Sequence, residues 1–496
     1  MSIFIFPTVV HILFPPRRAA KLRLALPHIN ISPTSCVIPR MKPIIALLAL
    51  FFALAAQWPP ELPKGATFLE PFPQRDGDPV RGYEYLIYGD YVNAGPPLEL
   101  FRKTINAKKV DDLGRTGDNR GIPFAYNAVT TADGAKVVAP TCLTCHAEYL
   151  NGKLIVGLGN NTNDFTDKGK GMGWAGSVVK LRYGAHSPEW LGFEPASRAY
   201  EALRKHIVTE VRGVNPADKV FAVLAAHRDA TDLSWIEKAK YYIPTDVVPT
   251  DVPAWWLMKK KNALYYNGLG RGDFARLSMA SGILTMRDSS EARHIDERFS
   301  DVMAWIRTLE PPKYPFPVDE QLVAAGKVVF DEKCSKCHGT YGETETYPNL
   351  LIDLKVVKTD STLALLYPKY PEYHNWYNQS WFAEEPSSAR LLPNHGYVAP
   401  PLDGIWASAP YLHNASVPTL EDLLNSPQRP TYWKRSFNNS DYDPAKLGWK
   451  YEVKTHKTDS ETYDTTLPGY GNYGHTFGDR LTGEDRKALL EYLKTL

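Results

Sequence analysis

The chain is poor in cysteine, and it has no methionine beyond Met303. Only five cysteines occur in 496 residues, and four of them form two Cys-x-x-Cys-His motifs, at 142–146 and 334–338. The fifth is Cys36, so no set of cysteines remains for a disulfide framework. A net charge of +2 gives no reason to expect a nucleic-acid partner.

The two motifs have the spacing that attaches c-type haem. Each thiol can bond to a haem vinyl group, and the histidine that follows can bind the iron. A zinc site would need a second cysteine pair or two histidines nearby, but the motifs lie 192 residues apart (337 − 145). A thioredoxin-like disulfide motif lacks the trailing histidine. The sequence therefore predicts two covalent haem c groups, held by Cys142, Cys145 and His146 and by Cys334, Cys337 and His338.

An apolar run at 44–56 follows Met41 and Lys42 and ends in small residues before Gln57. This pattern is typical of a signal peptide at 41–56, and the run is too short for a good spanning helix. Because c-type haem is attached outside the bacterial cytoplasm, we expect a periplasmic or secreted protein without a stable membrane span. Residues 1–40 are interpreted as an upstream-start artefact, with a long n-region or a membrane anchor as the alternative.

Helical patterns frame both motifs. Apolar residues at 299–306 and at 489–496 follow the i, i+3, i+4, i+7 spacing of one helix face, and Pro311-Pro312 ends the first of these helices. A further helix leads into the second motif, and its Gly326 permits close approach of a crossing helix. No strand alternation is strong enough to predict a large sheet.

We therefore expect a mainly α fold with two cytochrome c-like haem domains, long loops and insertions. The first domain is placed at 57–313 and is enlarged, and the second at 314–496. Between them lies the proline-rich linker 310–317.

The missing methionines bear on the second iron ligand of the second haem. A His/Met haem is excluded there unless the other domain donates the methionine. The histidines available in the second domain are His374, His395, His413, His456 and His475. His475 is favoured because it lies in the glycine-rich segment 469–478, just before the last helix, where cytochromes c place their sixth ligand. The alternative is a loop histidine without contact to the iron.

Two other features have two interpretations each. His413, in the rigid aromatic segment 399–414, is either a core histidine or a contact to a haem propionate or between the haems. Trp255 and Trp256 begin a run that continues into three lysines, and they are either core residues or part of an electron relay and propionate site. Phe274, in the segment 270–276, is a candidate for an apolar distal pocket. For the first haem no distal ligand stands out, which favours an open site.

Taken together, these motifs resemble the di-haem cytochrome c peroxidase superfamily, and most closely its rubber-oxygenase-like branch. The resemblance covers roughly residues 80–496. It includes Pro-Leu-x-Gly-Ile-Trp-Ala-x-Ala-Pro-Tyr-Leu-His-Asn at 401–414 and Gly-Asn-x-Gly-His-x-Phe-Gly at 471–478. It implies that the His146 haem is reactive and that the second haem is six-coordinate, with His475 at the distal position. It also implies a tryptophan between the haems, a role that Trp255 or Trp256 would fill.

The expected function is that of a haem-dependent oxidoreductase. The first haem would bind dioxygen or hydrogen peroxide, and the second would transfer electrons. The partners would be small redox proteins as electron donors or an apolar organic substrate. Three hypotheses stand at this point: an oxygenase acting on an apolar substrate, a hydrogen peroxide reductase, and a non-enzymatic electron carrier.

Overall fold

The computed structural model describes residues 62–104, 111–167 and 173–496. Cys36, the upstream segment 1–40 and the predicted signal peptide lie outside the described residues. Residues 62–496 form one compact unit. In these described ranges no helix is both long and apolar enough to cross a membrane.

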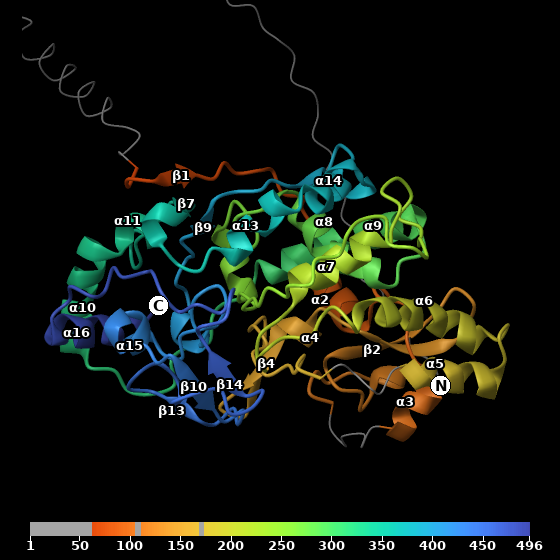
Figure 1. Ribbon diagram of the computed structural model, residues 1–496, viewed down its shortest axis with the longest axis horizontal. Coiled ribbons are helices and arrows are strands. Elements are labelled where there is room, and N and C mark those ends of the chain that lie inside the picture. Colours follow the sequence, from red (N-terminus) through yellow and green to blue (C-terminus); the bar gives the residue numbers. More distant parts are fainter. Residues whose placement is uncertain (1–61, 105–110, 168–172) are drawn as a thin grey trace, which may run out of the picture. The chain divides into compact units, whose positions relative to one another are not determined.

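Two pairs of crossing helices enclose the two motifs in sequence. Helix α2 (Pro79–Tyr88) packs on α9 (Ser289–Ile306), and α10 (Glu320–Lys333) packs on α16 (Gly483–Leu493), as Figure 1 shows for the second pair. A Cβ atom on Gly82 would lie 1.9 Å from the carbonyl oxygen of Asp301, and one on Gly326 would lie 2.0 Å from that of Ala488. Both crossings therefore require glycine, and the expected close approach at Gly326 is confirmed.

The prediction of a mainly α fold is wrong. The described residues are 37% helical and 14% strand, with the strands gathered in several small sheets. The strands are only two to five residues long, and some of them, such as β1 with β7 and β6 with β8, pair segments that are far apart in sequence. Strands this short show too few alternating residues for the period of two to be visible in the sequence.

The two three-stranded sheets are antiparallel and have the orders β1-β7-β9 and β13-β10-β14. Their strands are β1 (Ala66–Phe68), β7 (Leu350–Asp353), β9 (Gly396–Val398), β10 (Tyr432–Arg435), β13 (Tyr451–Lys454) and β14 (Thr462–Asp464). The two-stranded sheets pair β2 (Tyr126–Thr130) with β3 (Lys136–Pro140), β4 (Ala147–Leu150) with β5 (Lys153–Val156), β6 (Gly270–Gly272) with β8 (Ala389–Leu391), and β11 (Tyr442–Asp443) with β12 (Gly448–Trp449).

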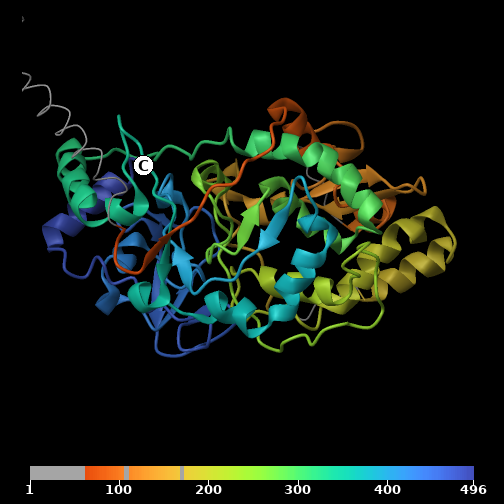
Figure 2. The ribbon, with the colours of Figure 1, turned by 90° about the horizontal axis from the view of Figure 1, so that it is seen from above.

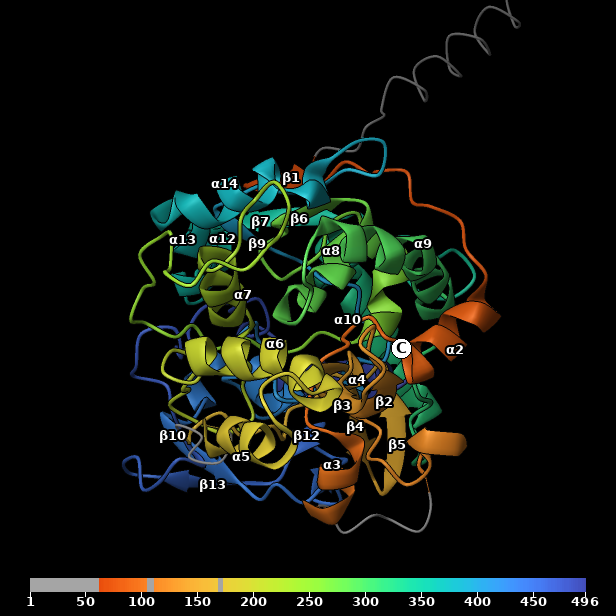
Figure 3. The ribbon, with the colours of Figure 1, turned by 90° about the vertical axis from the view of Figure 1, so that its right-hand side faces the viewer.

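The remaining helices are mostly short. They are α3 (Leu98–Thr104), α4 (Leu143–His146), α5 (Gly173–Tyr183), α6 (Pro188–Leu203), α7 (Ala217–Ala226), α8 (Phe274–Met279), α11 (Ser335–His338), α12 (Leu354–Val357), α13 (Thr362–Lys369), α14 (Pro371–Gln379) and α15 (Leu420–Leu423). The 3-10 helices are η1 (Gly117–Asn119), η2 (Trp255–Lys260), η3 (Ala280–Leu284), η4 (Trp381–Ala383), η5 (Ile405–Ala407) and η6 (Ser426–Gln428). Helices α5 and α6 pack on one another as a hairpin in the first predicted domain (Figure 3).

Strand pairing crosses the predicted domain division. Strand β1 pairs with β7, and β6 pairs with β8, so each of these sheets contains strands from both sides of residue 313. Between β1 and α2 the chain runs as an extended strap across the molecule towards α9 (Figure 2), where the Asp78 amide donates to Asp301 Oδ1. The division into 57–313 and 314–496 stays a prediction.

The two motifs lie against different clusters of buried apolar side chains. The larger cluster contains Trp255 and Phe299 and packs against Cys142. A second cluster contains Trp256 and Phe330 and packs against Cys334. Each motif is therefore surrounded by its own apolar environment, of the kind that a haem ring requires.

We expect Gly326→Ala to lower the free energy of unfolding by about 2 kcal/mol, because the added methyl group would overlap backbone atoms of α16. The measurement is the midpoint of chemical unfolding. Gly483→Ala is the matched control, since a Cβ atom there meets nothing within 4 Å. Equal midpoints for the two variants would contradict the close crossing.

Candidate haem-binding sites

The first motif forms a short helix between two strands. Helix α4 follows β3 and leads directly into β4. The amides of Cys145 and His146 both donate to the carbonyl oxygen of Cys142, at 3.2 and 3.0 Å, which fixes the turn. The Asn215 side chain donates to Cys145 Sγ at 3.3 Å. The two thiols and the imidazole are thus presented from one helical turn.

Burial governs the ionisation of the cysteines. The described cysteines form no disulfide. Burial raises the pKa of the Cys142 thiol to about 12 and that of the Cys334 thiol to about 11, so neither is a reactive thiolate at neutral pH. A buried thiol of this kind lacks the thiolate character on which a redox-active Cys-x-x-Cys motif depends.

Trp255 stacks on the imidazole of His146, with ring centroids 4.6 Å apart and an angle of 20° between the planes. Gly157 ties the two residues together, because its amide donates to the His146 carbonyl and its carbonyl accepts from the Trp255 amide, both at 2.8 Å. Trp305 meets Trp255 edge-on at 6.4 Å. Trp255 therefore belongs to the surroundings of the first motif.

Trp256 points into the other half of the core. Its side chain is 1% exposed and belongs to the cluster around Cys334. Its indole N–H donates to the carbonyl of Asp403 at 2.8 Å. The adjacent tryptophans thus face different motifs, which the sequence alone does not show.

The second motif continues from α10 into α11. The Cys334 amide donates to the carbonyl of Phe330, so the motif extends the last turn of α10. His338 Nδ1 lies 2.8 Å from the carbonyl oxygen of Pro400. Since that oxygen can only accept, Nδ1 carries the proton, and Nε2 is left as the nitrogen that can bind a metal. At the first motif the carbonyl of Pro253 faces His146 in the same way, although its Nδ1 makes no hydrogen bond of normal geometry.

His475 lies opposite His338. The ring centroids are 6.4 Å apart, and the planes meet at 60°. A metal–imidazole bond is about 2 Å long and the ring nitrogen lies about 1 Å from the ring centre, so two imidazoles on opposite sides of one ion have centres about 6 Å apart. The observed separation therefore leaves room for one iron between the two rings.

Burial favours the neutral form of a candidate ligand ring at each of the two motifs, His146 at the first and His475 at the second. Burial lowers the pKa of His146 to about 3. Burial, with smaller contributions from His338 and Arg429, lowers the pKa of His475 to about 3 as well. Only a neutral imidazole can bind a metal, so this electrostatic environment suits ligation.

The loop before His475 is tightly constrained. His475 has a φ of +46°, and its amide donates to the carbonyl of Val357 at 2.7 Å. Gly474 has a φ of +78°, and a Cβ atom there would lie 2.3 Å from the backbone of Lys358 and Thr359. The glycine therefore allows the loop to lie against the turn after α12 and to direct His475 towards His338.

His413 is buried and hydrogen-bonded. Its Nε2 lies 3.1 Å from the Tyr397 hydroxyl, which donates to the carbonyl of Asp360 at 2.7 Å, and the two rings stack at 4.1 Å. The His413 carbonyl accepts from the amide of Asp251 at 2.7 Å. These contacts match a core histidine in a turn, and its proposed contact to a haem propionate stays a prediction.

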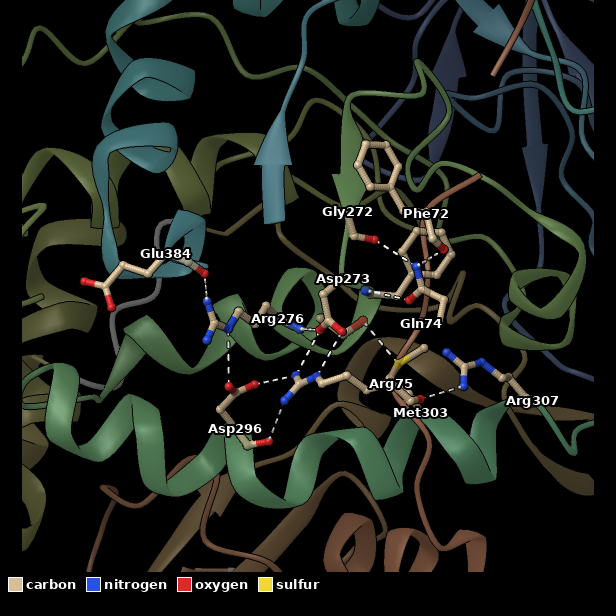
Figure 4. A network of polar contacts seen from close by, with 12 residues as sticks. Phe72, Gln74, Arg75, Gly272, Asp273, Arg276, Asp296, Met303, Arg307 and Glu384 are labelled. Carbon is tan, nitrogen blue, oxygen red and sulfur yellow. Dashed lines mark hydrogen bonds and ion pairs between the residues drawn. The ribbon is translucent and has the colours of Figure 1, made fainter. Parts of the chain in front are cut away.

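Phe274 is 3% exposed and lies at the start of α8, in the core cluster that packs against Cys142. Its amide donates to the side chain of Gln74 at 2.9 Å. Figure 4 shows the neighbouring ion-pair network, in which Arg75 bonds to Asp273 and to Asp296. The strap between β1 and α2 therefore holds the start of α8, and with it Phe274. Its role in a distal pocket stays a prediction.

The two sites differ in what faces the motif histidine. Among the described residues, the one aromatic or imidazole ring found against His146 is that of Trp255, whereas His338 has His475 opposite it. Nor do the described residues contain a cluster of three or more His, Cys, Asp or Glu side chains that could hold a separate metal ion.

Several residues of these sites were missed by the sequence analysis. They are Pro253 and Pro400, which face the motif histidines, Asn215 at Cys145, and Asp360 and Arg429 at the His475 loop. Pro253 and Pro400 lie so far along the chain from their motifs that no sequence spacing identifies them. The contacts at Asn215, Asp360 and Arg429 arise only from tertiary folding.

Residues 396–434 match a family model described as RoxA-like, cytochrome c-like. The match supports a haem cytochrome c family of the RoxA branch, and a cytochrome c-like domain implies covalently bound haem c. The matched segment runs from β9 to β10 and includes Pro400, His413 and Arg429, but neither Cys-x-x-Cys-His motif.

Two curated relatives are uncharacterized proteins of Sinorhizobium fredii (strain NBRC 101917 / NGR234). The chain is 27% identical to protein y4iM over 292 residues, which are 51% of this chain and 66% of y4iM. It is 42% identical to protein y4iJ over 111 residues, which are 20% of this chain and 18% of y4iJ. The chain thus spans just under two thirds of one relative and less than a fifth of the other.

We expect Gly474→Ala to displace the loop that carries His475, since its Cβ atom would overlap the backbone after α12. The predicted result is a larger high-spin fraction in the optical and EPR spectra of the purified haem protein. Gly342→Ala is the control, because Gly342 also has a positive φ but a Cβ atom there meets nothing within 4 Å. If both variants had the same spectra as the parent protein, the close packing of Gly474 would not be what holds His475 in place.

Proposed function

We propose that the chain is an exported di-haem c-type cytochrome oxidoreductase. Cys142, Cys145 and His146 hold the first haem, and Cys334, Cys337 and His338 hold the second. Two features support two haems rather than one. Each motif lies in sequence between two helices that cross closely at a glycine, and each packs against its own apolar cluster. The match to a cytochrome c-like family model supports the chemistry of attachment.

His338 and His475 are proposed as the two residues that would bind the iron of the second haem. The observation that carries this proposal is the separation of 6.4 Å between their rings, together with the hydrogen bond that leaves His338 Nε2 free. Ligation by two histidines gives a lower potential than ligation by histidine and methionine, and a filled sixth position favours electron transfer over ligand binding.

The first haem is proposed to keep an open axial position. His146 has Trp255 stacked against it, and the surroundings are apolar, with Phe274 in the same cluster. The haem iron would supply the redox chemistry with dioxygen or hydrogen peroxide. The chain's own residues have three roles. His146 would bind the haem iron, the apolar cluster would exclude water, and Trp255 places its indole beside His146.

The proposed reaction is the oxidative cleavage of an apolar organic substrate. The RoxA-like match and the resemblance to the rubber-oxygenase-like branch favour this over reduction of peroxide. The test compares dioxygen uptake with polyisoprene against peroxide turnover with reduced cytochrome c. Uptake of dioxygen that depends on polyisoprene supports the oxygenase, and peroxide turnover alone would replace it by a peroxidase. Two haems that bind no carbon monoxide after reduction would leave an electron carrier.

We expect His475→Ala to convert the second haem from low spin to high spin, because the iron loses one imidazole. The measurement is the EPR spectrum of the oxidised protein, compared with that of His456→Ala, which changes an exposed histidine of the same half of the chain. A low-spin signal that survives in His475→Ala would refute the assignment of the ligand.

Trp255→Phe is expected to slow electron transfer between the haems several-fold, because its indole is the ring stacked on His146. Trp256→Phe is the matched control, since that side chain is buried in the other cluster and bonded to Asp403. The measurement is the rate at which the first haem is reduced after the second haem has been rapidly reduced. The relay role of Trp255 is refuted if electrons pass between the haems at the parent rate in both variants.

A further inference from the structure

Two charged side chains from distant parts of the chain, one buried and one partly buried, hold the loop that carries His475. Asp360 is 3% exposed and lies between α12 and α13. Arg429 follows η6 and is partly buried. In the sequence they precede His475 by 115 (475 − 360) and 46 (475 − 429) residues, so no local pattern connects them to the loop.

Asp360 binds the first part of the loop through its carboxylate. Its Oδ2 accepts hydrogen bonds from the amides of Gly469 and Gly471, at 3.1 and 3.3 Å, and from the Tyr473 hydroxyl at 3.3 Å. Its Oδ1 accepts from the amide of Thr362 at 2.9 Å, which fixes the carboxylate at the start of α13. A hydrogen bond from an amide to an ionised carboxylate is stronger than one between two neutral groups.

Arg429 binds the second part of the loop through its guanidinium group. Its Nη1 donates to the carbonyls of Asn472 and Gly474, at 2.6 and 2.7 Å, and its Nη2 donates to the carbonyl of His475 at 3.2 Å.

The other donors of Arg429 bind a rigid anchor. Nε donates to the carbonyl of Asp422 at 3.1 Å, and Nη2 donates to that of Leu423 at 2.8 Å, both in α15. In the described part of the chain no carboxylate comes within ion-pair distance of this guanidinium group, so its donors are committed to carbonyls. Burial lowers the pKa of Arg429 to about 10, so the group remains charged at neutral pH.

We call Asp360 and Arg429 together the clamp. The clamp is needed because the loop conformation is unfavourable by itself. His475 has a φ of +46°, a region that side chains with a Cβ atom seldom adopt. Three glycines precede it within seven residues, at 469, 471 and 474, and give the free loop many other conformations. A residue in such a strained conformation persists only when its surroundings determine it.

We propose that Asp360 and Arg429 are positioning residues that hold His475 in the conformation in which it binds the iron of the second haem. The inference rests on the proposed function, in which His475 is that ligand. Neither residue hydrogen-bonds to the imidazole, and both act through the loop backbone. The Pro400 carbonyl orients His338 by a contact to its ring, whereas Asp360 and Arg429 orient His475 through the loop that carries it.

The test measures how easily an external ligand displaces His475. The variants are Arg429→Met, Arg429→Lys and Asp360→Asn, purified with haem. The readouts are the low-spin fraction of the second haem by EPR and the carbon monoxide concentration that half-saturates this haem after reduction. In Arg429→Met and Asp360→Asn we expect this concentration to fall about tenfold or more, as for the loss of a buried charge-assisted hydrogen bond. Arg429→Lys keeps the charge but not the planar fork, so an intermediate fall is expected.

One control comes from the same region. Arg486 also donates to backbone carbonyls, those of Leu424 and Leu481. Its side chain makes no hydrogen bond to the loop 469–475 among those found in the described residues. Arg486→Met should therefore keep the parent half-saturation, and an equal fall in this control would overturn the proposal.

His475→Ala in the same assay separates the two claims. If His475→Ala leaves the second haem low-spin, the ligand assignment itself fails. If it becomes high-spin while Arg429→Met and Asp360→Asn retain parent spectra and parent half-saturation, the positioning role alone is refuted. External imidazole should restore the low-spin signal in the clamp variants, which distinguishes a displaced ligand from a collapsed site. If Arg429→Met does not fold, Arg429→Lys and Asp360→Asn decide by the same criteria.

Discussion

The constraint on which the two sites depend is the placement of neutral, buried imidazoles at fixed positions. His338 is oriented by a prolyl carbonyl, and His475 is brought to a ring separation of 6.4 Å from it by a loop that runs against the turn after α12. A histidine on a free glycine-rich loop would lose this geometry to conformational entropy. The surrounding backbone contacts therefore decide whether His475 stays opposite His338.

The two motifs are alike in sequence and unlike in their surroundings. Each lies in sequence between two helices that cross at a glycine, at Gly82 and at Gly326, and each has a proline carbonyl near the motif histidine. Beyond that the symmetry ends, because an indole lies against His146 while a second imidazole lies opposite His338. A filled position suits electron transfer and an open one suits reaction with a small oxidant, so the difference is the physical basis of the proposed division of labour.

What the sequence could predict follows from how local each signal is. The motifs, the last helices of both halves and the close crossing at Gly326 are local patterns, and the structure contains the helices and the crossing. The preference for His475 came from the lack of methionine beyond Met303 and from the glycines around it. The mainly α fold was wrong because the strands are too short to show alternation. Asp360, Arg429 and the opposite directions of Trp255 and Trp256 could not be predicted, since they depend on contacts between segments far apart in sequence.

The most direct measurement of the central claim is a combined determination of haem content and iron coordination in the purified protein. The haem-to-chain ratio would come from the pyridine haemochrome spectrum, and the coordination from EPR of the oxidised form. Two haems per chain, one with a low-spin bis-histidine signal and one high-spin, are the predicted result. A single haem per chain, or two haems with the same coordination, would contradict it.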